Sequence, residues 1–209
     1  MHPFTLHVVR HGESEWNRKG LVQGQSPEAG GLTERGVLEA VDAGARLRAL
    51  GAGPGEIVSS DLQRALETAR IIGTELDRPI RVDPSFREQR YGVLEGHRLD
   101  EVIDGESVRD SIDALWSDLS RSPEGGESVA EMGDRVLQAV LRLGPDAEAI
   151  VVCHGGPVRT LLERARSREI VPGLRGEVAN GSIATFTVSR GDTKAALAMV
   201  DRGLRPTER

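Results

Sequence analysis

The sequence is poor in cysteine, in aromatic residues and in long apolar runs. It has one cysteine, Cys153, and only 3% aromatic residues. A lone cysteine excludes an intramolecular disulfide and fits a reducing compartment, so we expect a cytoplasmic protein. No apolar stretch is long enough to span a bilayer, and the first residues lack the basic and apolar regions of a secretory signal. We therefore expect no membrane association and a core built mainly from aliphatic side chains.

Basic residues are also outnumbered. The chain has 27 Lys and Arg against 33 Asp and Glu, a net charge of -6. This balance argues against broad binding to nucleic acid. The 209 residues contain no internal repeat, low-complexity tract or linker, so we expect a single domain over residues 1–209.

Two short apolar runs each end in a histidine followed by glycine. Phe4–Val9 leads into Arg10-His11-Gly12, and Ala149–Cys153 leads into His154-Gly155. Short runs of this kind are typical of buried strands. In open α/β sheets, ligands bind beyond the carboxyl ends of the strands, so we expect the two histidines to meet in one site.

The remaining pattern alternates strands with helices. Further strands are expected at Ile57–Val58 and Ile80–Val82, and a closing hairpin at 182–188 and 195–200. Such alternation predicts an α/β three-layer sandwich, with a mainly parallel sheet, an antiparallel edge and helices on both faces. The intervening stretches 19–32 and 84–105 are expected to be irregular, and the tail is expected to fray from about residue 202.

The expected helices have recognisable caps. Thr33 caps a helix that reaches about Leu50, Asp61 caps the next, and Ser128 with Glu131 fits a capping box for a helix to about Leu143. Other helices are expected from about Glu106 to Leu119 and after His154, with Pro157 in the first turn. The apolar face predicted for the first of these helices is Val37, Leu38, Val41, Ala45 and Leu47.

The residue types at these strand ends suit phosphoryl transfer. A neutral imidazole at His11 is a candidate nucleophile, and Arg10 and Arg64 offer planar forks for phosphate oxygens. His154 is a candidate for a further charged donor. Glu88, in the irregular stretch, is the candidate general acid for the leaving alkoxide.

Less specific interpretations exist for each residue. His11 and His154 also fit hydrogen-bonded structural histidines, and Arg10 and Arg64 also fit surface ion pairs. Glu88 lies in a region rich in other carboxylates, namely Asp83, Glu95, Asp100 and Glu101.

An ordered set of motifs decides between these interpretations. Arg10-His11-Gly12-Glu13-Ser14 resembles the signature of the histidine phosphatase superfamily, also called phosphoglycerate-mutase-like. The resemblance covers nearly the whole chain, through Asn17, Gln23-Gly24, Leu32–Gly36, Ser59–Ala65 with Thr68-Ala69, Arg87-Glu88, Tyr91-Gly92, Glu95-Gly96, Glu124–Ser128 and Val152–Gly156.

The resemblance implies a phosphohistidine mechanism without a metal or other cofactor. His11 would attack phosphorus, Arg10, Arg64 and His154 would hold its oxygens, and Glu88 would exchange the proton. The resemblance also implies a set of substrate-binding residues, which are Ser14, Asn17, Gln23, Gly24, Arg90, Tyr91 and Gly155.

The same resemblance bears on the choice between phosphatase and mutase. Cofactor-dependent mutases carry two arginines after the tryptophan that Trp116 matches, whereas this chain has Ser117-Asp118. His97 stands in place of an expected lysine and Gly156 in place of an asparagine. We therefore expect a phosphomonoesterase for a small phosphorylated metabolite. A phosphoglycerate mutase and a non-catalytic phospholigand-binding protein stay open as alternatives, and a homodimer is expected only by analogy with the family.

Overall fold

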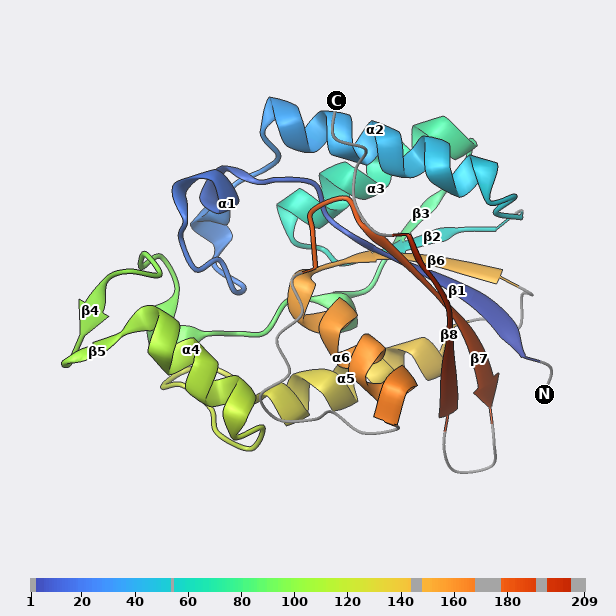
Figure 1. The fold of residues 1–209 in the computed structure, drawn as a ribbon. Helices are drawn as coiled ribbons and strands as arrows, with labels where there is room; N and C mark the ends of the chain where they lie inside the picture. Colours follow the sequence, from blue (N-terminus) through green and yellow to red (C-terminus); the bar gives the residue numbers. More distant parts are fainter. Residues whose placement is uncertain (1–2, 54, 144–147, 168–177, 191–194, 204–209) are drawn as a thin grey trace.

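A six-stranded sheet forms the centre of the protein in a computed structural model that describes residues 3–53, 55–143, 148–167, 178–190 and 195–203 (Figure 1). The strand order is β3-β2-β6-β1-β7-β8. The strands are β1 (Phe4–Arg10), β2 (Ile57–Ser59), β3 (Ile80–Val82), β6 (Glu148–Cys153), β7 (Ile183–Arg190) and β8 (Ala195–Gly203). β1, β2, β3 and β6 pair in parallel, whereas β7 and β8 are antiparallel, which confirms the predicted antiparallel edge.

Helices cover both faces of this sheet, as predicted for a three-layer sandwich (Figure 1). Helices α2 (Glu34–Ala49) and α3 (Gln63–Leu76) lie on one face, and α5 (Val129–Leu141) and α6 (Gly155–Ser167) lie on the other. Successive side chains of a strand point to opposite faces. In β6, Ile150 and Val152 pack in the cluster under α2 and α3, while Val151 and Cys153 pack with α5 and α6.

Helix α2 buries a different face from the one predicted. Val37, Leu38 and Val41 are 41%, 69% and 41% exposed. The buried face consists mainly of small residues, namely Gly36, Ala40, Ala43 and Gly44, with Glu39 and Leu47. The reason is close packing on α3, since a Cβ on Gly44 would lie 2.9 Å from the Cβ of Glu75. Leu47 is buried as predicted. The prediction for Val37, Leu38, Val41 and Ala45 was wrong because it followed the apolar spacing, and here mainly small residues make the contact.

The start of α2 also touches the loop that follows β1. A Cβ on Gly12 would lie 2.1 Å from the carbonyl oxygen of Gly36, and a Cβ on Gly36 would lie 2.0 Å from that of Glu13. The absence of side chains at Gly12 and Gly36 therefore allows the backbone that follows His11 to pack directly against the backbone of the first turn of α2. Thr33 caps α2 as predicted, because its side chain accepts from the amide of Gly36.

The predicted cap of α3 was wrong. Leu62 occupies the N-cap of α3 without a side-chain hydrogen bond. Asp61 instead accepts two hydrogen bonds from the guanidinium of Arg87. The carboxylate is drawn away from the helix because a bidentate, charge-assisted pair is stronger than a neutral cap.

Short elements lie within the segments expected to be irregular and directly beside them. They are α1 (Glu15–Lys19), η1 (Pro27–Ala29), η2 (Pro84–Phe86), η3 (Gly92–Leu94) and a hairpin of β4 (Val102–Ile103) with β5 (Glu106–Ser107). Because residues 106–107 pair in that hairpin, α4 (Val108–Ser117) begins two residues later than predicted. β8 continues to Gly203, past the point where the tail was expected to fray.

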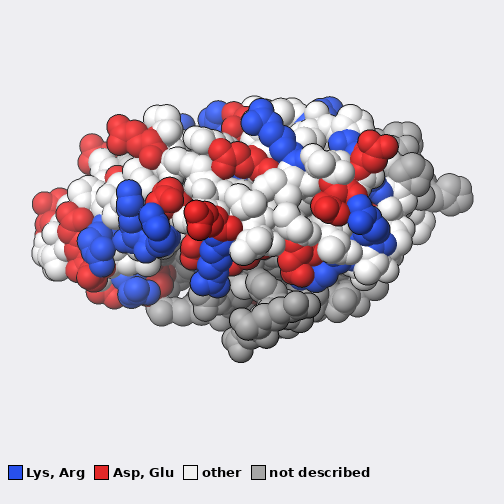
Figure 2. Space-filling model, turned by 90° about the horizontal axis from the view of Figure 1, so that it is seen from above, with Lys and Arg blue, Asp and Glu red and all other residues white. Residues whose placement is uncertain are grey.

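Charges on the surface are mixed in sign. On the face shown in Figure 2, Lys and Arg side chains lie among Asp and Glu side chains. Within the described residues, none of the helices is long and apolar enough to cross a membrane.

The capping box of α5 gives a test of local stability. Ser128 accepts from the amide of Glu131, and the Glu131 carboxylate accepts from the amide of Ser128. We expect Ser128→Ala to lower the free energy of unfolding by about 1 kcal/mol in urea titrations. Ser117→Ala, at the exposed end of α4, is the control and should change it by less than about 0.5 kcal/mol. Equal effects of the two substitutions would contradict the capping role.

Candidate active site

Parallel pairing of β1 with β6 brings the two histidines together. Val9 pairs with Val152 and Arg10 with Cys153, so His11 and His154 follow at the same edge of the sheet. Their ring centroids lie 5.1 Å apart with an interplanar angle of 59°. Both are buried, at 2% and 0% exposed. The expectation that the two strand ends form one cluster is confirmed.

Hydrogen bonds fix the tautomer of His11. Its Nδ1 lies 2.7 Å from the carbonyl oxygen of Gly12, which can only accept, so Nδ1 carries the proton. Nε2 therefore has the lone pair, and it accepts from Nε of Arg64 at 3.2 Å. The imidazole is held in the neutral form that has its lone pair on Nε2, the form that an attack on an electrophile requires once the bond from Arg64 is released.

Arg64 reaches this position from the first turn of α3. It is only 2% exposed, and its Nη2 donates to the carbonyl oxygen of Gly24 at 2.9 Å. Burial lowers the pKa of Arg64 to about 10, so the side chain is still charged at neutral pH. Thr68, one turn further along α3, accepts from the amide of Gly12 and donates to the carbonyl of Arg64.

His154 is linked to β2 by one ring nitrogen. Its Nε2 lies 2.9 Å from the hydroxyl oxygen of Ser60, whereas its Nδ1 is buried and has no hydrogen-bond partner among the described residues. Leaving a buried polar atom unsatisfied costs about 1–3 kcal/mol. Arg10 extends from the end of β1, and its guanidinium donates to the carbonyl oxygen of Val178.

Both histidines are neutral when no ligand is bound. Burial, followed by the charge of Arg64, holds the pKa of His11 and that of His154 well below the usual value of 6.5. This changes the expected role of His154, which we predicted to be a charged donor. It is uncharged in the ligand-free protein, and an anion bound beside it would favour its protonation.

Glu88 lies at the start of α6, beside these residues. Its carboxylate oxygens accept from the amide of Gly156 at 3.1 and 3.2 Å, and one also accepts from the amide of Gln89 at 2.8 Å. A helix N-terminus favours a carboxylate there. Gly156 permits the contact, because a Cβ at that position would lie 2.2 Å from Oε1 of Glu88. Of the alternative carboxylates, Asp83 caps η2, Glu95 accepts from the amides of Gln25 and Tyr91, and Asp100 and Glu101 pair with Arg98 and His97.

Three of the predicted substrate-binding residues form one hydrogen-bonded chain. The hydroxyl of Ser14 lies 2.7 Å from Oε1 of Gln23 and 3.0 Å from Oδ1 of Asn17, within the capping box of α1. Asn180 joins this chain, because its Nδ2 lies 3.3 Å from Asn17 Oδ1 and 3.0 Å from the carbonyl of His11. Asn180 was not among the predicted site residues, although it lies in the stretch 173–182 that we expected to contribute to pocket specificity.

The other four predicted residues are placed differently. Gly24 has a φ of 46° and contacts Glu95, and Gly155 lies beside Arg10 and Glu88. Tyr91 lies at the base of η3, where burial raises the pKa of its hydroxyl. The side chain of Arg90 is exposed, and its backbone makes two hydrogen bonds with Glu127: the amide of Arg90 donates to the Glu127 carboxylate, and its carbonyl accepts from the Glu127 amide. The structure therefore gathers Gly24, Tyr91 and Gly155 near the histidines or Glu88, but shows no contact of the Arg90 side chain with them.

One cation lies where the sequence predicted none. The guanidinium carbon of Arg159, from α6, lies 4.5 Å from the ring centroid of Trp116 in α4. Sequence order gave no sign of this contact, because the two residues belong to different helices. No cluster of His, Cys, Asp and Glu that could hold a metal ion occurs among the residues that the structure describes.

Fold and site together define an α/β protein with a cluster of histidine, arginine and carboxylate at the carboxyl edge of its sheet. A sequence profile of the histidine phosphatase superfamily (branch 1) matches residues 6–201. The probable phosphoglycerate mutase GpmB of Erwinia tasmaniensis is 38% identical over 154 residues, which are 72% of this chain and 69% of that protein. The chain therefore belongs to the histidine phosphatase superfamily.

Solved structures with the same fold extend over almost the whole chain. A mycobacterial glucosyl-3-phosphoglycerate phosphatase, solved with VO3, is 26% identical with a TM-score of 0.81, covering 95% of this chain and 98% of that one. Bacillus stearothermophilus YhfR is 28% identical with a TM-score of 0.81, covering 96% of each chain. The names of these relatives include both a mutase and a phosphatase.

The lowered pKa values of the histidines give a test of pH-dependent stability. As pH falls below 6.5, the unfolded chain binds protons at His11 and His154, whereas the folded chain does not. The contribution of each histidine to the free energy of unfolding is therefore constant above pH 6.5. Below pH 6.5 it decreases by up to about 1.4 kcal/mol per pH unit for each histidine. Urea titrations from pH 7.5 to 5.0 measure this slope. His154→Gln should make it shallower, and an unchanged slope would show that burial does not lower the pKa of His154.

Proposed function

We propose that this chain is a metal-independent phosphomonoesterase that works through a phosphohistidine intermediate. The observation that carries the proposal is the state of His11, whose Nε2 has a lone pair while Nδ1–H is held by a carbonyl oxygen. A buried, neutral and oriented imidazole beside a charged arginine is suited to attack an anionic phosphorus centre.

In the first step, Nε2 of His11 attacks phosphorus, a P–N bond forms and the P–O bond to the substrate's alkoxide breaks. Arg10, Arg64 and His154 hold the phosphoryl oxygens, and the unpartnered Nδ1 of His154 gains a partner if that atom faces an oxygen. Glu88 gives its proton to the leaving alkoxide. In the second step, Glu88 accepts a proton from water, the water oxygen attacks phosphorus and the P–N bond breaks, which releases inorganic phosphate.

The surroundings of this centre support hydrolysis rather than mutase activity. Ser117 and Asp118 follow Trp116, and among the described residues the cation found against the Trp116 ring is Arg159. A side chain at Gly156 would also collide with Glu88 and Met132, so an asparagine at that position does not fit this arrangement. We infer a substrate that is a small phosphorylated metabolite with few further anionic groups.

Phosphoglycerate mutase activity is the second candidate, favoured by the 38% identity to a probable phosphoglycerate mutase. The two activities differ in the acceptor of the phosphoryl group. Incubation with 3-phosphoglycerate and bisphosphoglycerate should release inorganic phosphate from a phosphatase. Interconversion of 3- and 2-phosphoglycerate that depends on bisphosphoglycerate, without matching phosphate release, would favour the mutase. A panel of phosphorylated metabolites, assayed by phosphate release, would then identify the substrate.

The nucleophile is tested by substitution. The purified protein should hydrolyse p-nitrophenyl phosphate in EDTA, and His11→Ala should lower kcat by more than about a thousandfold. His97→Ala, which removes a half-exposed histidine paired with Glu101, is the matched control and should retain the activity. Retained turnover in His11→Ala would refute the phosphohistidine mechanism. Phosphate binding without turnover by the wild-type protein would instead indicate a non-catalytic phospholigand-binding protein.

A further inference from the structure

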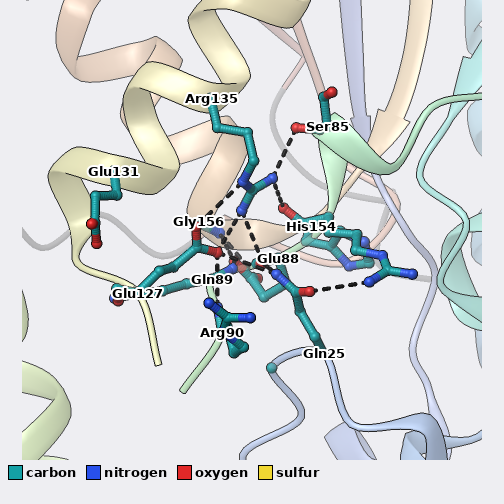
Figure 3. A network of polar contacts seen from close by, with 12 residues as sticks. Gln25, Ser85, Glu88, Gln89, Arg90, Glu127, Glu131, Arg135, His154 and Gly156 are labelled. Carbon is teal, nitrogen blue, oxygen red and sulfur yellow. Dashed lines mark hydrogen bonds and ion pairs between the residues drawn. The ribbon is translucent and has the colours of Figure 1, made fainter. Parts of the chain in front are cut away.

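The segment that carries Glu88 has little regular structure to hold it. Residues 87–91 lie between the short helices η2 and η3, in a part of the chain without sheet pairing. The carboxylate of a general acid must nevertheless be placed within hydrogen-bond reach of the leaving oxygen. Side chains from other elements hold this backbone in place of a sheet (Figure 3).

Arg135, in the middle of α5, makes most of these contacts. Its Nη1 donates to the carbonyl oxygens of Ser85 at 2.8 Å and Arg87 at 3.1 Å, and its Nη2 donates to that of Glu88 at 3.3 Å. One carbonyl of η2 and two carbonyls of the irregular segment after it therefore converge on one guanidinium (Figure 3). Only a planar fork with several fixed donors can bind them together.

Glu127 fixes the guanidinium in turn. Its Oε1 accepts from Nη2 of Arg135 at 2.6 Å and its Oε2 accepts from Nε at 3.3 Å. With these bonds, all five N–H groups of Arg135 have partners. Oε1 of Glu127 also accepts from the amide of Arg90 at 3.0 Å. The ion pair therefore binds the backbone before Glu88, at the carbonyl of Arg87, and after it, at the amide of Arg90.

Glutamine side chains complete the network. Nε2 of Gln25 donates to the carbonyl of Glu88 at 2.9 Å and lies 3.2 Å from Oε1 of Glu127. Gln89 is fully buried, and its Nε2 donates to the carbonyl of Glu127 at 2.9 Å. The backbone of Glu88 is thus held by Arg135 and Gln25, while its carboxylate is held by the amide of Gly156 (Figure 3).

We propose that Arg135, supported by Glu127, is a positioning residue for the general acid Glu88. The inference rests on the proposed function. Arg135 contacts only the backbone of the segment, so its expected effect is on the placement of the Glu88 carboxyl group relative to the leaving oxygen. Loss of the guanidinium removes one hydrogen bond from each of three carbonyls and leaves that of Glu88 to Gln25 alone, so the carboxyl group then moves with a segment that has fewer restraints.

The leaving group of the substrate gives a test that is specific to this role. An alkoxide is a strong base and needs a proton as it leaves, whereas p-nitrophenolate is a weak base and leaves with little help. In Arg135→Met, we expect kcat for glycerol phosphate to fall by about a hundredfold, while kcat for p-nitrophenyl phosphate stays within about threefold. Arg135→Lys, which keeps the charge but not the fork, should lie between the wild-type protein and Arg135→Met.

The matched control is Arg142→Met. Arg142 lies at the end of the same helix and donates to the hydroxyl of Ser85, but it does not contact the carbonyl of Glu88. It should leave the ratio of the two rates unchanged. If Arg135→Met does not fold, Arg135→Lys and Glu127→Gln decide the question by the same ratio.

The outcomes separate this inference from the proposed function. A selective loss with glycerol phosphate supports the positioning role. An equal loss with both substrates, or no loss with either, overturns it and leaves only a structural role for Arg135. If the wild-type protein hydrolyses neither substrate, or if His11→Ala keeps both rates, the proposed function itself fails.

Discussion

The site depends on the parallel pairing of β1 with β6. That register places the two imidazole centroids 5.1 Å apart at the sheet edge. On the other side of β1 lies the antiparallel strand β7, and Asn180, which precedes β7 in the chain, donates to the carbonyl of His11. A slip of one residue would turn His11 to the opposite face of the sheet and separate it from His154. The aliphatic strands are buried on both faces, so the core that stabilises the fold also holds the register of the site.

Burial at this edge is unfavourable without a ligand. Arg64 is charged and almost fully buried, yet the hydrogen-bond acceptors that it has among the described residues are a ring nitrogen and a carbonyl oxygen rather than a carboxylate. A buried cation without a directly bonded carboxylate is costly, and so is the unsatisfied Nδ1 of His154. Both features lower the stability of the ligand-free protein. An anion with several oxygens would pair with the Arg64 charge and could accept from Nδ1 of His154. Stability is therefore given up where an anionic ligand can restore it.

Sequence reasoning succeeded where the signal was local. The apolar runs before His11 and His154 predicted two strands, and their carboxyl ends predicted one cluster. The cap at Thr33 and the capping box at Ser128 predicted two helix starts. It failed where a distant residue decided the outcome. Asp61 looked like a cap because Arg87, its partner, lies 26 positions away. Leu38 looked buried because the close fit of Gly44 against Glu75 cannot be read from one helix. Arg135 belongs to no motif, because three of its partners are backbone carbonyls, which have no sequence signature.

The contact between Gly12 and Gly36 has a consequence for how such a protein can change. A methyl group at Gly12 would meet the backbone of Gly36, and one at Gly36 would meet the backbone of Glu13, so neither position leaves space for a side chain. The loop of the nucleophile and the first turn of α2 therefore form one rigid part, and few substitutions are tolerated at the contact in either segment. Variation in substrate choice must then come from segments that are not bound to this part, and the small elements from β4 to α4 lie outside it (Figure 1). Residues that determine substrate choice can therefore change during evolution while the residues around the nucleophile stay the same.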